Sequence, residues 1–185
     1  MSGLPNILTF LRMAFIPVVI FLFYLQNQTG YYIAAAIFIL ACITDYLDGY
    51  FARTYDQTTN LGRFLDPVAD KLLICSTLLL LVGFDHIKGL SLIPAIVILC
   101  REILVSGLRE FLAETNLLMP VTMLAKWKTG LQMVALSVLI IAKPTADLFS
   151  LMNLGLAGLW IAAALTFVTG YDYVKAGLKM VSSAR

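Results

Sequence analysis

Four aspartates in the first half of the chain are spaced so that they can share helix faces. Asp45 and Asp48 lie three residues apart, and Asp66 and Asp70 lie four residues apart. Residues three or four positions apart are neighbours on the surface of an α-helix, so each pair occupies one face. The connection between the two pairs is short enough to make their helices antiparallel neighbours. The sequence therefore predicts that four carboxylates point into one space.

Such a cluster of carboxylates indicates a metal site. Carboxylates at close range repel one another and are costly at a membrane boundary unless a cation neutralises them. Oxygen ligands without His or Cys select hard ions, which favours Mg²⁺, with Mn²⁺ or Ca²⁺ as alternatives. Gly49 and Ala52 share the face of the first pair and leave space for a substrate beside the backbone. Simple charges at helix ends would account for Asp56, but not for the shared faces and small residues.

Long apolar segments must position these acids. The chain has 185 residues, of which 61% are hydrophobic and only 13% are charged, and its mean hydropathy is +0.91. Soluble domains are about one-quarter charged, so this composition indicates a membrane protein. We expect a single all-α membrane domain over residues 1–185 with six transmembrane helices: Ile7–Leu25, Tyr31–Phe51, Val68–Phe84, Leu92–Phe111, Val121–Ala142 and Phe149–Val174.

The basic residues predict how these helices are oriented. With six spans, ten Lys and Arg residues lie toward one side of the membrane, and only Lys88 and Lys143 lie toward the other. Cytoplasmic loops are enriched in Lys and Arg, so we expect both termini, and the aspartates, at the cytoplasmic boundary of a cell membrane. The net charge of +2 is too small to suggest nucleic acid as a partner.

The acids and their neighbours form a longer pattern, Asp45-x2-Asp48-Gly49-x2-Ala52-Arg53-x8-Gly62-x3-Asp66-x3-Asp70. Position for position, this pattern resembles the signature of the CDP-alcohol phosphatidyltransferases, membrane enzymes that make phospholipids and related lipids. The resemblance extends to the six-helix layout and to the cytoplasmic placement of the motif. It implies that an alcohol attacks the lipid-bearing phosphorus of a CDP-linked lipid and that CMP is released.

The resemblance also implies a role for each matched residue. Asp45, Asp48 and Asp66 would be the principal ligands of one or two metal ions over the diphosphate. Asp70 would be the base that takes the proton of the acceptor, and it would also touch a second metal. These roles suit phosphoryl transfer, which needs charge neutralisation and an aligned nucleophile more than covalent help. Four further matched residues would border the cytidine and diphosphate: Gly49, Ala52, Arg53 and Gly62.

Basic residues near the same boundary bear on the acceptor. Arg109 and Lys126 lie at the depth of the aspartates, and Lys128 faces the same side. Arg binds phosphate oxygens bidentately and Lys supplies a point charge, although topology alone also places basic residues there. The segments PNILTFLR, LDPVADK, REILVSGLREF and AKWKTGLQ resemble the family branch of bacterial phosphatidylglycerophosphate synthases. That branch joins CDP-diacylglycerol to glycerol 3-phosphate, so these three residues would bind the acceptor phosphate. The resemblance further implies a homodimer and nucleotide or phosphate contacts from Asn6, Thr9 and Arg12.

Three alternative functions compete with this interpretation. Inositol phosphate is the nearest alternative acceptor, because it too needs an anion pocket. A divalent-cation transporter would also carry carboxylates in a helical bundle, but near the bilayer midplane rather than clustered at one end. A membrane adaptor without chemistry leaves the spacing of the acids unexplained.

Three polar residues outside the motif have predictions of their own. Arg101 and Glu102 fall about mid-span, where an unpaired charge costs at least roughly 2.5 kcal/mol, so we expect them to pair with polar groups inside the bundle. A structural role is the first expectation for both, and a contribution to the acceptor pocket is the second. His86 is expected to lie exposed on a loop, on the side opposite the aspartates.

Overall fold

The computed structural model describes residues 4–55, 60–114, 123–142 and 149–183, and its described side chains are those of 8–45, 65–112, 127–142 and 151–177. Within these ranges the chain forms α-helices and one short 3₁₀ turn, Gly89–Ser91, with no strand. The all-helical prediction is therefore confirmed. The helices are α1 (Leu4–Tyr24), α2 (Gln28–Tyr55), α3 (Asn60–Gly83), α4 (Leu92–Glu114), α5 (Met123–Ala142) and α6 (Phe149–Ser183).

Each expected span corresponds to one of these helices. By length and composition, three stretches of the described residues are apolar enough to cross a membrane: Gln28–Asp45, Gly89–Leu112 and Leu151–Gly177. Shorter apolar stretches lie at Leu8–Tyr24 and Trp127–Ala142. Membrane-spanning helices are thus supported, whereas the crossing of all six remains a prediction.

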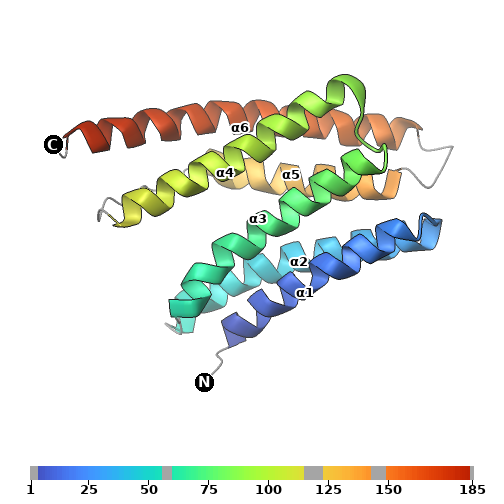
Figure 1. The fold of residues 1–185 in the computed structure, drawn as a ribbon, viewed down its shortest axis with the longest axis horizontal. Coiled ribbons are helices and arrows are strands. Elements are labelled where there is room, and N and C mark those ends of the chain that lie inside the picture. The colour runs from blue at the N-terminus through green and yellow to red at the C-terminus, as the bar shows by residue number, and fades with distance from the viewer. Residues whose placement is uncertain (1–3, 56–59, 115–122, 143–148, 184–185) are drawn as a thin grey trace.

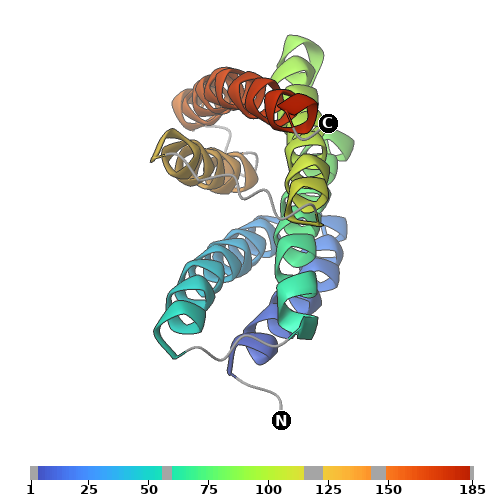
Figure 2. The same ribbon diagram turned by 90° about the vertical axis from the view of Figure 1, so that its left-hand side faces the viewer.

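The helices form two groups that α3 connects (Figure 1). Helices α1 and α2 pack against each other, α5 and α6 pack against each other, and α4 lies along α6. Helix α3 contacts α1 in one group and α4 and α5 in the other, and α2 also contacts α5. Figure 2 shows the bundle from the end that holds both described termini. The end of α2, the start of α3 and the end of α4 lie at that same end (Figure 1).

The apolar core fills the opposite end of the bundle. It is built from the second halves of α1, α3 and α5 and the first halves of α2, α4 and α6, through buried residues such as Phe38, Leu81 and Leu139. Small residues let the helices approach closely there: a Cβ on Gly155 would lie 2.9 Å from the side chain of Leu139. The end with the termini is consequently free to hold polar side chains.

The structure corrects the prediction for His86. Its side chain is buried in the core instead of exposed, with Nδ1 2.8 Å from the carbonyl oxygen of Leu139 and the ring packed near Phe23 and Tyr31. The cause is the backbone turn after α3, in which the amide of His86 donates to the carbonyl of Leu81. This turn directs the imidazole inward, a placement that the loop composition does not reveal.

Candidate active site

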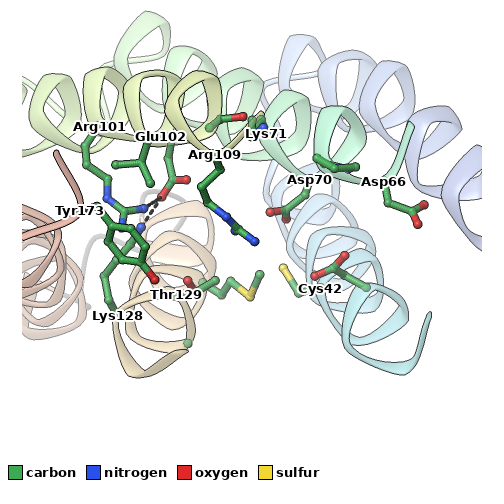
Figure 3. Close-up of a pocket in the computed structure, with 16 residues that line it drawn as sticks. Cys42, Asp66, Asp70, Lys71, Arg101, Glu102, Arg109, Lys128, Thr129 and Tyr173 are labelled. Carbon is green, nitrogen blue, oxygen red and sulfur yellow. Dashed lines mark hydrogen bonds and ion pairs between the residues drawn. The ribbon is translucent and has the colours of Figure 1, made fainter. Parts of the chain in front are cut away.

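A cavity of about 780 Å³ opens at the end of the bundle that holds the termini. Helices α2, α3, α4, α5 and α6 all contribute to its lining. Its volume is in the range of sites that hold small molecules and cofactors, about 300–1,000 Å³. Carboxylates line one side of this cavity and basic residues line the other (Figure 3).

Three of the four predicted aspartates meet in this cavity. Asp45 comes from α2. Asp66 and Asp70 come from successive turns of α3 (Figure 3). We call these three residues the acidic cluster. Helical spacing places Asp66 and Asp70 on one face of α3, and α1, which packs against both α2 and α3, links them to Asp45.

Helix α1 holds two members of the acidic cluster from behind. Nη1 of Arg12 lies 2.6 Å from Oδ1 of Asp45, and the hydroxyl of Thr9 donates a hydrogen bond to the carboxylate of Asp66. Thr9 and Arg12 are almost completely buried, and neither is among the residues that line the cavity. The predicted contacts of both residues with the nucleotide or its phosphates stay a prediction, and the structure adds these contacts to the acids. Arg12 thereby offsets part of the negative charge that four clustered aspartates would create.

The remaining predicted site residues have side chains that the structure does not describe. Helix α2 continues to Tyr55 and α3 begins at Asn60, so the backbone at the predicted positions is helical. Their roles therefore stay predictions. The residues are Asn6, Asp48, Gly49, Ala52, Arg53, Gly62 and Lys126.

The donor chemistry of the acidic cluster fits a hard divalent ion. Its ligand atoms are carboxylate oxygens, the type that Mg²⁺ and Mn²⁺ prefer. Among the described residues, however, no three His, Cys, Asp or Glu side chains are gathered closely enough to hold an ion. Two of the acids contact α1, and the fourth aspartate, Asp48, is not among the described side chains. The fit therefore rests on the kind of ligand and not on a formed coordination shell.

Charged residues of α4 and α5 line the opposite side of the cavity. We call the three cations Arg101, Arg109 and Lys128, together with their carboxylate partner Glu102, the basic cluster. Lys128 is 1% exposed and forms an ion pair with Glu102. Nη1 of Arg101 lies 3.6 Å from Oε1 of the same carboxylate. The prediction that Arg101 and Glu102 pair inside the bundle is thus confirmed.

Arg109 occupies a different position within the basic cluster. Its side chain extends from α4 into the space between the acidic cluster and Tyr173 (Figure 3). Among the described residues it takes part in no ion pair, whereas Lys71 at the same end pairs with Glu110 at 3.7 Å. Arg109 can therefore meet an anion that enters the cavity.

Comparison with known proteins identifies the family. The family model described as CDP-alcohol phosphatidyltransferase matches residues 2–168. This chain belongs to the CDP-alcohol phosphatidyltransferase family. The match includes every residue of the aspartate motif and of the basic cluster.

Several relatives within this family are similar over nearly their whole length. A protein of Rickettsia typhi is 48% identical over 176 residues, which cover 95% of this chain and 97% of the relative. One from Rickettsia prowazekii is 49% identical over 175 residues, 95% of each chain, and one from Pseudomonas fluorescens is 44% identical over 177 residues, 94% of this chain and 89% of the relative. Each is named CDP-diacylglycerol–glycerol-3-phosphate 3-phosphatidyltransferase.

The cavity is also lined by a residue that the sequence analysis did not identify. Tyr173 of α6 lines the cavity, and its ring centroid lies 5.8 Å from the guanidinium carbon of Arg101. No local pattern in the sequence links Tyr173 to a residue 72 positions earlier. The packing of α6 along α4 creates this contact.

The buried pair of Glu102 and Lys128 yields a first prediction. Glu102→Ala would leave the ammonium of Lys128 without its counterion, so we expect the free energy of unfolding to fall by about 3 kcal/mol. Glu110→Ala is the matched control, because the Glu110 side chain is 65% exposed and its pair with Lys71 should be worth less than about 1 kcal/mol. Denaturant unfolding in detergent measures both, and equal losses would contradict a stabilising role for the buried pair.

Proposed function

We propose that this protein transfers the phosphatidyl group of CDP-diacylglycerol to glycerol 3-phosphate, giving phosphatidylglycerol phosphate and CMP. The observation that carries the proposal is the cavity in which an acidic cluster faces an arginine that is in no ion pair among the described residues. The names of the relatives from Rickettsia and Pseudomonas agree with it. One substrate is a lipid and the other is an anion in water, which suits a site at the end of a membrane bundle.

The reaction would proceed at the acidic cluster. A hydroxyl of glycerol 3-phosphate attacks the phosphorus that carries diacylglycerol, and the bond from that phosphorus to the oxygen of CMP breaks. Asp70, which lines the cavity on the side of the acidic cluster that faces Arg109, would take the proton of the attacking hydroxyl. CMP then leaves with the electron pair of the broken bond.

A divalent metal completes this proposal. We propose one or two Mg²⁺ ions, or Mn²⁺, held by Asp45, Asp48, Asp66 and Asp70. Bound metal would neutralise the diphosphate, which the cluster alone would repel. Gly49, Ala52, Arg53 and Gly62 would border the cytidine and diphosphate, with Asn6 nearby. For Thr9 and Arg12, the contacts to Asp66 and Asp45 support a role in holding the acids in place.

The acceptor phosphate would bind on the other side of the cavity. Arg109 would be its main ligand, because it reaches into the cavity and can bind phosphate oxygens bidentately. Lys126 and Lys128 would add positive charge, the second of these from within its ion pair with Glu102.

We also propose the setting in which the enzyme works. It would be a multi-pass protein of the cell membrane, in contact with membrane lipids, with the cavity and both termini facing the cytoplasm. Two observations support this orientation: the asymmetry of Lys and Arg, and the position of both described termini at the cavity end (Figure 1). A homodimer is proposed from family resemblance alone.

CMP release by the purified protein in detergent tests the function. With CDP-diacylglycerol and Mg²⁺, we expect release with glycerol 3-phosphate and little with inositol phosphate, serine or no acceptor. Replacing Mg²⁺ by EDTA should stop release, and Mn²⁺ should restore it. Release with inositol phosphate instead would keep the reaction and change the acceptor. No release with any acceptor would overturn the proposal and return attention to ion transport.

Asp70→Asn tests the base. The amide cannot accept the proton, so turnover should fall below about 1% of the wild-type rate, because general bases typically contribute about 10²- to 10⁴-fold. Binding of CDP-diacylglycerol, measured with radiolabelled lipid, should be largely retained. Asp172→Asn, at an exposed position on α6, is the control and should keep full turnover. Normal turnover by Asp70→Asn would remove Asp70 from this role.

Arg109→Ala tests the acceptor site. The variant loses a charged ligand of the phosphate, so the KM for glycerol 3-phosphate should rise about tenfold or more, while the KM for CDP-diacylglycerol changes little. Lys175→Ala removes a positive charge from an exposed position of α6 and should leave both constants unchanged. An unchanged acceptor KM in Arg109→Ala would rule out a role in acceptor binding and leave Arg109 as a basic residue of the membrane boundary.

A further inference from the structure

The side chain of Arg101 packs against the surface of α6 at Gly170, where no side chain occupies the space. Gly170 is buried, and a Cβ added there would lie 2.9 Å from Cγ of Arg101 and 3.6 Å from its Nε. A Cβ essentially never comes that close to another atom, so a side chain at position 170 would force the stem of Arg101 to move. The absence of a side chain at Gly170 thus allows Arg101 its present path.

Arg101 lies between two different environments. Its stem lies beside Gly170 at an apolar groove of about 280 Å³ between α4 and α6, which Leu104 and Phe167 also line. Its guanidinium reaches the polar cavity, where it contacts Glu102 and the ring of Tyr173. The long side chain therefore crosses from an apolar face of the bundle to the site of chemistry.

Three contacts restrict the orientation of this guanidinium. Gly170 admits the stem, Tyr173 offers its ring at a cation–π distance, and Glu102 supplies a carboxylate. The Nε of Arg101 is buried and has no hydrogen-bond partner among the described residues. A buried hydrogen-bond donor without an acceptor costs free energy, and an anion in the cavity would supply the acceptor.

We propose that Gly170 and Tyr173 are positioning residues, which hold Arg101 so that it strengthens the binding of a phosphorylated acceptor. Arg101 and Arg109 line the cavity from the same helix, so a phosphate drawn in by Arg109 also lies in the field of Arg101. An arginine side chain has much rotational freedom, and fixing it before the ligand arrives reduces the cost of binding. The inference rests on the proposed function, because it concerns the acceptor of that reaction.

Gly170→Ala is the first test. The added methyl group displaces Arg101, so the KM for glycerol 3-phosphate should rise about tenfold, with kcat and the KM for CDP-diacylglycerol within about twofold of wild type. The matched control is Gly177→Ala, whose Cβ would lie 2.8 Å from Leu108. It crowds the same pair of helices away from Arg101, and should not change the acceptor KM.

Tyr173 provides a second, independent test. Tyr173→Phe keeps the aromatic ring and should keep the acceptor KM near the wild-type value, whereas Tyr173→Leu should raise it severalfold. Leucine adds no steric crowding, so the acceptor KM of these variants tests the role of Tyr173 even if Gly170→Ala does not fold. Thermal unfolding in detergent shows whether each variant is folded. An unchanged acceptor KM in Tyr173→Leu would overturn the role of Tyr173.

A double-mutant cycle shows whether Gly170 acts through Arg101. Arg101→Gln alone should raise the acceptor KM, and adding Gly170→Ala to it should change the KM by less than about twofold. Multiplication of the two effects would overturn the inference. Wild-type protein that ignores phosphorylated acceptors would instead refute the proposed function and the inference together. Wild-type activity with glycerol 3-phosphate and an unchanged KM in Gly170→Ala and Tyr173→Leu would refute the inference alone.

Discussion

The pairing of charges between helices is the constraint on which the cavity end depends. An unpaired charge inside a membrane bundle costs at least about 2.5 kcal/mol, and the structure avoids this cost at two points. Arg12 of α1 pairs with Asp45 of α2, and Lys128 of α5 pairs with Glu102 of α4. Each pair joins two helices outside the main apolar cluster of the described residues. The same contacts that satisfy buried charges therefore fix the two sides of the site.

This arrangement divides the bundle into a supporting half and a reactive half. Apolar residues and close helix packing stabilise the end away from the termini, where His86 adds a buried polar contact to the carbonyl of Leu139. At the other end, charged side chains replace the core and leave a cavity. An enzyme that joins a lipid to a water-soluble anion needs this combination, because its reacting atoms must lie near water while its helices remain in hydrocarbon.

The parts of this structure that follow from local spacing could be predicted from the sequence. The apolar runs predict all six helices, and helical periodicity predicts that Asp66 and Asp70 share one face of α3. The partners across the bundle could not be predicted in the same way. Thr9 bonds to an acid 57 residues away, and Tyr173 meets an arginine of another helix, because tertiary packing selects these contacts. The prediction for His86 was wrong for a related reason, because the backbone turn after α3 directs its side chain into the core.

As the proposed acceptor site, the basic cluster would favour some acceptors over others through its charge. Its described members are three cations, Arg101, Arg109 and Lys128, and one carboxylate, Glu102, which leaves two positive charges. A phosphate monoester carries about −1.5 to −2 charges at neutral pH and would match them closely. Serine or inositol would bring no compensating charge and would leave the guanidinium groups of the site without an anionic partner. In the proposed function, a phosphorylated acceptor would therefore suit the charge of the basic cluster as well as the positions of its side chains.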